Sequence, residues 1–182
     1  MAHGKRLVVT VFGSSKPGEG DAEYETAQEV GRRLAEAGFA VCNGGYGGIM
    51  EATARGAKEA GGATIGVVAR IFSTVSNAFI DRKIVENSLV DRLMKLIELG
   101  DAYVVLKGGT GTLVELAMVW ELMNKRLAAE KPIIVIGSFW SPVVKTLKDQ
   151  LAYEGRGVAT KHVTRVSTPK KCVEVLKERL RT

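Results

Sequence analysis

The stretch AYVVLKGGTGTLVE, residues 102–115, decides the fold. Its first half is a short apolar run that predicts a buried strand over residues 102–106. Its last residues open an apolar helical pattern that continues from residue 113 to about residue 126. Between the two lies a turn rich in glycine. A buried strand, a glycine turn and a helix, in this order, are typical of one unit of a parallel α/β sheet.

The same alternation recurs along the chain. Further strands are expected at 7–12, 39–42, 63–68, 132–136 and 163–166. Further helices are expected at 21–37, from the glycine cluster to 60, at 87–99, from 141, and from 169. Residues 69–86 have no clean period and are expected to form a long surface loop. Right-handed crossovers then give a Rossmann-like, doubly wound parallel sheet with helices on both faces, in one domain over residues 1–182.

Composition excludes several classes of protein. Of the 182 residues, 46% are hydrophobic and 25% are charged, which is typical of a globular protein and excludes general disorder. The longest apolar runs are too short to span a bilayer, and the N-terminus lacks a signal-peptide core. Cys42 and Cys172 lie in apolar patterns, as buried thiols do in a reducing compartment. We therefore expect a cytoplasmic protein with no membrane partner.

The charge balance is mildly basic. The 26 basic and 20 acidic residues give a net charge of +6, which fits an anionic small molecule or a polyanion. No nucleic-acid-binding motif accompanies this charge, so nucleic acid is not an expected partner. No metal is expected, because neither histidine has cysteine or carboxylate neighbours at the spacing of a metal site.

The glycine turn is the first candidate site. Gly108, Gly109 and Gly111 let a ligand approach the backbone, and the amide groups at the start of the following helix attract anions, most often phosphate. Thr110 and Thr112 add hydroxyl donors. The stretch is not a Walker A loop, and the first strand is not followed by GxGxxG. A simple tight turn is the alternative, but the density of glycine and threonine favours the anion site.

Glu115 has two interpretations. Thr112 and Glu115 have the spacing of a capping box, in which each side chain satisfies a backbone donor of the other residue. Alternatively, Glu115 lies beside the bound phosphate's sugar, where it hydrogen-bonds ribose hydroxyls or orients a water molecule. The spacing alone leaves both interpretations open.

Two other groups of residues are candidates. Gly13, Ser14 and Ser15 follow the first strand, which commonly lies beside the fourth strand in such sheets, so these residues would line the same crevice. A turn or helix-capping role is the alternative for the serines. Arg92 and Lys95 share one helix face, for which spacing alone favours simple solvent exposure.

Three motifs give the chain a resemblance to a known family. These are FGSS at 12–15, NGGYGGIM at 43–50 and GGTGTLVE at 108–115, and together they resemble the LOG (LONELY GUY) family. The resemblance runs from about residue 7 to residue 131. It implies a Rossmann-like fold, usually a homodimer, and the activity of a cytokinin riboside 5′-monophosphate phosphoribohydrolase. Relatives are often labelled lysine decarboxylases, but no lysine here is marked out for pyridoxal phosphate.

The resemblance also assigns roles. It implies that Glu115 and Arg92 serve catalysis and that the loop from Gly108 to Thr112 holds the 5′-phosphate. It implies that the remaining candidates line the nucleotide site: Gly13, Ser14, Ser15, Gly44, Gly45 and Lys95. No cofactor is implied. Three positions depart from the family's pattern: Lys107 replaces a proline, Leu93 a basic residue and Met118 an acidic residue.

The sequence thus predicts hydrolysis of the N-glycosidic bond of a nucleoside 5′-monophosphate, of the AMP or cytokinin riboside type. The main alternative is a carrier, because divergent relatives include a carrier of molybdenum cofactor that binds a phosphorylated pterin without turnover. A third alternative is a DNA-associated Rossmann domain, against which the lack of a DNA-binding motif counts.

Overall fold

The apolar runs of the chain assemble into one seven-stranded sheet. In the computed structural model, which describes residues 6–180, all strands are parallel and their order is β4-β3-β2-β1-β5-β6-β7. Residues 1–5, on which the expected lack of an export signal partly rests, lie outside the described residues. The strands are β1 (Val8–Phe12), β2 (Ala40–Asn43), β3 (Thr64–Ala69), β4 (Arg82–Glu86), β5 (Ala102–Val105), β6 (Ile133–Ile136) and β7 (Val163–Val166).

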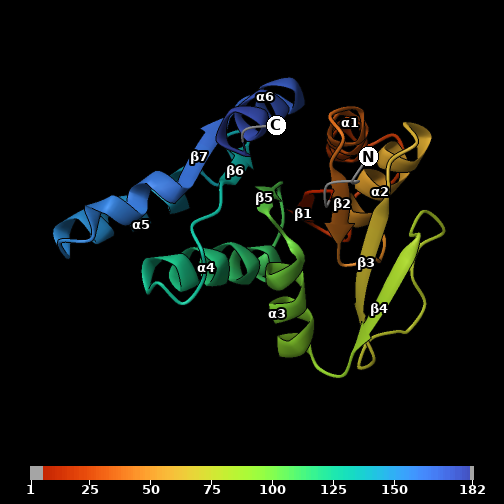
Figure 1. Cartoon of the computed structure of the whole chain (residues 1–182), viewed down its shortest axis with the longest axis horizontal. Coiled ribbons are helices and arrows are strands. Elements are labelled where there is room, and N and C mark those ends of the chain that lie inside the picture. The colour runs from red at the N-terminus through yellow and green to blue at the C-terminus, as the bar shows by residue number, and fades with distance from the viewer. Residues whose placement is uncertain (1–5, 181–182) are drawn as a thin grey trace, which may run out of the picture.

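Helices cover both faces of the sheet (Figure 1). Side chains of α1, α2 and α6 pack with Val9 and Val11 of β1 on one face, whereas side chains of α3, α4 and α5 pack with Val8 and Phe12 on the other. This division follows from the alternation of side chains along a strand. The helices are α1 (Ala22–Glu36), α2 (Ile49–Glu59), α3 (Leu89–Leu99), α4 (Thr110–Asn124), α5 (Ser141–Tyr153) and α6 (Pro169–Leu180), with a 3₁₀ turn η1 (Gly157–His162) before β7.

The fold class is confirmed, and two local expectations are wrong. Residues 82–86 were expected in a loop but form β4, which pairs with β3. β4 is an edge strand in which the charged residues Arg82, Lys83 and Glu86 flank a short apolar centre. This apolar run is too short to indicate a strand in the sequence. Helix α4 begins at Thr110, three residues before the expected start. Gly109 is its N-cap, so Thr112 and Glu115 are inside the helix and do not form a capping box.

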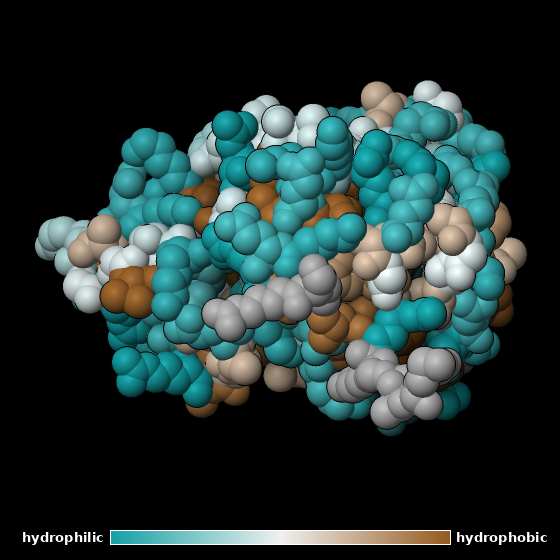
Figure 2. Space-filling view, turned by 45° about the horizontal axis from the view of Figure 1, so that its top comes forward, coloured by the Kyte–Doolittle hydropathy of each residue, from teal (hydrophilic) through white to brown (hydrophobic). Residues whose placement is uncertain are grey.

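The outer surface is mostly hydrophilic, as expected for a sheet whose apolar side chains are buried beneath helices. Seen from the side of α1 and α6, hydrophilic side chains cover most of the face, with hydrophobic atoms showing between them (Figure 2). Within residues 6–180, no helix is both long and apolar enough to cross a bilayer.

Candidate active site

The candidate site lies where β1 and β5 end side by side. The two strands pair in register, with Phe12 opposite Val105, as expected for the first and fourth strands that the sequence predicts. After β1, the Ser14 N–H donates to the Lys107 carbonyl oxygen at 3.0 Å, and the Ser14 carbonyl oxygen accepts from the Ile49 N–H at 2.8 Å. The loop after β1 is therefore fixed between the loop after β5 and the start of α2. A crevice at this position is the usual ligand site of an open parallel sheet.

A cleft of about 660 Å³ opens at this edge. The expected residues that line it are Gly13, Ser14, Ser15, Arg92, Gly109, Thr110, Gly111, Thr112 and Glu115. The structure thus brings together three segments that lie far apart in the sequence. The volume is within the range of small-molecule sites.

The start of α4 presents free backbone donors to this cleft. The first hydrogen bond within the helix runs from the Leu113 N–H to the Gly109 carbonyl oxygen, so the preceding amide groups have no intrahelical acceptor. A Cβ on Gly109 or Gly111 would meet no atom within 4 Å, so protein packing does not explain these glycines. The open space over the amides instead suits the close approach of an anion.

Glu115 stands one turn into α4 and is half-buried at the wall of the cleft. Burial raises the pKa of its carboxyl to about 7, and the positive charge of Arg92 opposes the rise. Its carboxylate forms no hydrogen bond or ion pair with any side chain of residues 6–180. Glu115 is also the one carboxylate among the residues that line the cleft. A carboxyl group near its midpoint at neutral pH can exchange protons or hold a water molecule.

Arg92 is a buried cation rather than part of a solvated helix face. It is 7% exposed, and its Nε donates to the Val67 carbonyl oxygen at 2.8 Å. One terminal nitrogen donates to the Gly44 carbonyl oxygen at 3.2 Å, and the guanidinium lies 5.4 Å from the centre of the Tyr46 ring. Burial lowers the pKa of Arg92, while the nearby Glu115 acts against this. The strand ends thus fix a positive charge close to Glu115.

Other predicted site residues do not reach the cleft. A Cβ on Gly44 would overlap the Arg92 guanidinium, so the absence of a side chain at Gly44 allows Arg92 to occupy its position. Gly45 donates its N–H to the Asn43 side chain at 2.8 Å. Lys95 does not line the cleft, and its ammonium pairs with Glu98 at 2.6 Å. Lys95 is therefore on the solvated side of α3.

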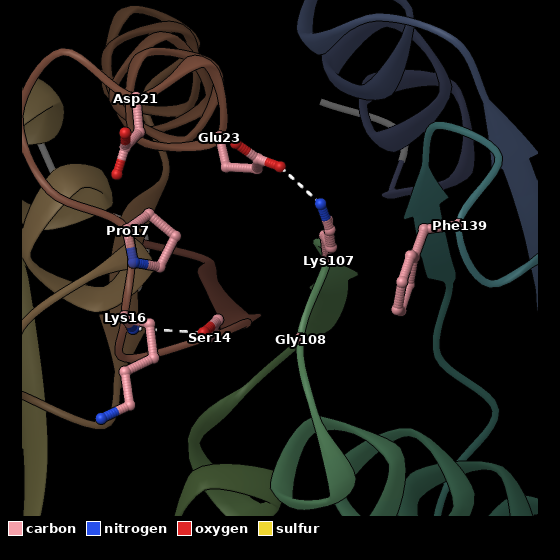
Figure 3. A pocket seen from close by; sticks show the side chains of 8 residues that line it. All are labelled: Ser14, Lys16, Pro17, Asp21, Glu23, Lys107, Gly108 and Phe139. Atoms are coloured by element: carbon pink, nitrogen blue, oxygen red, sulfur yellow. Dashed lines mark hydrogen bonds and ion pairs between the residues drawn. The ribbon is translucent and has the colours of Figure 1, made fainter.

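Gly108 borders a second cavity of about 390 Å³ (Figure 3). Lys107, which occupies the position of the family's proline, forms an ion pair with Glu23 at 2.6 Å, and its ammonium lies 5.8 Å from the centre of the Phe139 ring. The hydrogen bond from Lys107 lowers the pKa of Glu23. Ser14 and Lys16 line both this cavity and the cleft, so the two spaces adjoin.

Several residues of the cleft were not predicted. Tyr46 could have been found, because it interrupts a glycine cluster between a strand and a helix. Phe72, Ser73 and Leu89 come from irregular chain or a helix start and carry no pattern that points to a site. The full set that sequence reasoning missed is Lys16, Tyr46, Met50, Phe72, Ser73 and Leu89.

Tyr46 fixes the outer wall of the cleft. Its hydroxyl accepts from the Ala69 N–H at 2.8 Å and donates to the Ser73 carbonyl oxygen at 2.9 Å. Its ring contacts Phe72 edge-on with 6.4 Å between the ring centres. Tyr46 thereby ties the segment after β3 to the glycine loop after β2.

We expect Tyr46→Phe to loosen this wall while leaving the ring in place. The Ala69 N–H loses its acceptor, and a lost buried hydrogen bond costs roughly 1–3 kcal/mol. Amide exchange at Ala69 should therefore be about tenfold faster or more. Tyr24→Phe is the matched control, because the Tyr24 hydroxyl donates to the Glu51 carboxylate at 3.1 Å and not to the segment after β3. It should leave amide exchange at Ala69 unchanged. Equal exchange in wild type and Tyr46→Phe would contradict the anchoring role.

No metal cluster is apparent in this part of the molecule. Residues 6–180 contain no group of three or more His, Cys, Asp or Glu side chains arranged to hold an ion.

Comparison with known proteins places the chain among relatives of known family. Residues 6–173 match the model of the SLOG cluster4 family. The chain is 37% identical to a protein of unassigned function from Archaeoglobus fulgidus, over 72% of this chain and 85% of that protein. It is 33% identical to a protein from Mycobacterium tuberculosis named cytokinin riboside 5′-monophosphate phosphoribohydrolase, over 70% of this chain and 69% of that protein.

A solved structure shares the fold. The molybdenum cofactor binding protein from Rippkaea orientalis superposes with a TM-score of 0.75 and 24% identity, covering 97% of this chain and 98% of that one.

Proposed function

The chain belongs to the LOG family, as the SLOG cluster4 match and the named phosphoribohydrolase relative show, and on this premise we propose that it is a phosphoribohydrolase. Its substrate is a nucleoside 5′-monophosphate of the AMP or cytokinin riboside type. Water adds to C1′ of the ribose, the bond from C1′ to the base nitrogen breaks, and that nitrogen receives a proton. The products are the free base and ribose 5-phosphate.

The observation that carries this proposal is the position of Glu115 relative to the start of α4. A phosphate held by the amides after Gly109 leaves its sugar beside the next turn of the helix, which carries Glu115. There the carboxylate hydrogen-bonds a ribose hydroxyl or orients the attacking water as positive charge grows on the sugar. Arg92 supplies a fixed positive charge that stabilises the phosphate or the charge developing at the reacting groups.

The experiment is a product assay. Purified protein is incubated with AMP or with its N6-prenylated analogue, and free base is measured by chromatography. Release of base supports the proposal and ranks the two substrates. Lack of release, with either nucleotide still bound in calorimetry, contradicts it.

A second candidate is a non-catalytic carrier of a phosphorylated ligand. Glycoside cleavage commonly uses two carboxylates, whereas Glu115 is the one carboxylate lining this cleft. Met118, where the family has an acidic residue, packs against the core on the α3–α5 face. The name of the Rippkaea orientalis protein points to a molybdenum cofactor as one such ligand. A carrier is expected to bind a phosphorylated pterin saturably and release no product.

We also propose a cytoplasmic homodimer. Large hydrophobic side chains are exposed on the outer side of α3 and α4, beside the cleft: Leu89, Val90, Met94 and Val114. A second copy that covers them would bury apolar surface next to both sites. Sedimentation velocity is expected to give twice the mass of 19.6 kDa, and a monomer at high concentration would contradict the proposal.

A further inference from the structure

A separate cavity of about 330 Å³ lies at the end of the sheet where the strands begin, opposite the end that carries the candidate active site. Its lining comes from the segment before β6, the end of η1 and the end of α6: Glu130, Lys131, Pro132, Lys161, His162 and Arg179. β6 and β7 begin here, whereas the candidate active site lies where β1 and β5 end. Because all strands are parallel, the two sites are on opposite edges.

His162 is the unusual member of this set. The residue is only 6% exposed, yet its imidazole forms no hydrogen bond with any of residues 6–180. Neither ring nitrogen is sealed from solvent, because Ser141 is the one described residue with a fully covered, unpaired side-chain polar atom. The unpaired imidazole of His162 therefore keeps some exposure, and the residue lines the cavity. An imidazole that is mostly covered by protein and has no protein partner can hydrogen-bond a ligand or water in the cavity.

The charges around His162 are mainly positive. Arg179 reaches over the rim, where one terminal nitrogen donates to the Thr164 hydroxyl at 2.7 Å and the other to the Lys161 carbonyl oxygen at 3.4 Å. Lys161 pairs with Glu130 at 3.0 Å, and both of these side chains are more than half exposed. Burial lowers the pKa of His162, the positive charges of Lys161 and Arg179 lower it further, and Glu130 opposes them. This environment favours the neutral form of the His162 imidazole, which keeps one N–H donor.

We propose that this cavity binds a phosphorylated small molecule whose phosphate is held by Arg179, Lys161 and His162. A guanidinium from α6 and an ammonium and an imidazole from the end of η1 line one space, and a phosphate has enough acceptor oxygens for all three. The anion replaces Glu130 as the partner of Lys161. The volume leaves room for a sugar or nucleoside attached to the phosphate.

The test follows the ring of His162 by NMR during titration with inorganic phosphate and, separately, with AMP. The chain has two histidines, His3 and His162, so His162→Gln assigns the signal. We expect a saturable shift of the His162 signal and a higher pKa of its imidazole in the bound state, because a bound anion favours the charged ring. The signal reports on this cavity even if AMP also binds in the cleft.

Variants then separate a built site from general attraction to a basic surface. Arg179→Gln should raise the dissociation constant tenfold or more, and Lys161→Gln is a second variant of the same kind. Glu130→Gln should lower the dissociation constant severalfold, because it removes the competing carboxylate. Lys177→Gln, which removes one charge from the same helix outside the cavity, should bind like wild type.

Three results would overturn the proposal. They are an unchanged His162 signal at saturating phosphate and AMP, an equal loss of affinity in Arg179→Gln and Lys177→Gln, and no gain in Glu130→Gln. Tighter binding of AMP than of inorganic phosphate identifies an organic phosphate as the ligand. The reverse order identifies free phosphate and overturns the assignment of an organic part to the ligand.

Discussion

Glu115→Gln should lower the rate of base release from a nucleoside 5′-monophosphate by roughly 10² to 10⁴, the usual worth of a positioned acid or base. The amide keeps the size of the side chain but cannot carry negative charge or accept a proton. Binding should change little, because the phosphate site that we propose consists of backbone groups at the start of α4. The measurement is kcat and KM by product chromatography, with the loss confined to kcat.

The pH dependence of the rate tells whether Glu115 acts as a carboxylate or as a proton donor. Burial raises the pKa of Glu115 to about 7, so its carboxylate becomes the main form only above neutral pH. If the carboxylate orients water or stabilises the sugar cation, kcat/KM rises with pH through about 7 and then levels off. A rate that falls over the same range would make Glu115 a proton donor instead.

The same variant should be more stable than wild type in alkaline solution. The native carboxyl binds its proton more tightly than the unfolded one, with a pKa of about 7 against 4.5, so this group destabilises the folded state as pH rises through that interval. Above pH 8 the cost is on the order of 3 kcal/mol, which Glu115→Gln removes. Its melting temperature should exceed that of wild type by several degrees at pH 8.5 and match it near pH 4.

Glu121→Gln is the matched control for both effects. Glu121 lies on the same helix and is exposed, with its carboxylate 3.5 Å from the Lys125 ammonium. It should leave base release and melting temperature near wild type at both pH values. Undiminished turnover by Glu115→Gln would remove the catalytic assignment.

The sheet could be predicted from sequence because its central strands are buried on both faces. Such strands read as uninterrupted apolar runs, and the glycine turns mark where each one ends. β4 was not predicted, because an edge strand is half solvated and lacks an uninterrupted apolar run. Its pairing with β3 is a tertiary contact that no local sequence pattern encodes.

The loops of the candidate site were predicted because they follow strand ends, whereas the role of Arg92 in α3 was implied only by the family resemblance. Glu115 and the loop before it follow β5 directly, so the topology of the sheet places them in the crevice. The similar motif GGYGGIME at 44–51 also joins a strand to a helix, yet its Glu51 contacts Tyr24 and does not line the cleft. The wall around Phe72 depends on hydrogen bonds from Tyr46 and Asn77 across irregular chain. Such contacts have no periodic signal.

Helix α2 crosses α1 at two glycines, and this contact predicts the largest effect on stability. A Cβ on Gly56 would overlap the Gln28 carbonyl oxygen, and a Cβ on Gly31 would overlap that of Thr53. Both obstacles are backbone atoms, so neither can move aside by rotating a side chain. The two helices would have to separate, which would open the core that they form with β1 and β2.

We therefore expect Gly56→Ala to destabilise the protein by about 3 kcal/mol or more, with a melting temperature lower by roughly 10 °C. The loss is diagnostic because Ala in place of Gly within a helix otherwise gains up to about 1 kcal/mol from propensity alone. Gly111→Ala is the control for that gain, because Gly111 is in α4 and its added Cβ would meet no atom within 4 Å. It should melt at or above the wild-type temperature. If Gly56→Ala does the same, α1 and α2 do not pack as closely as described.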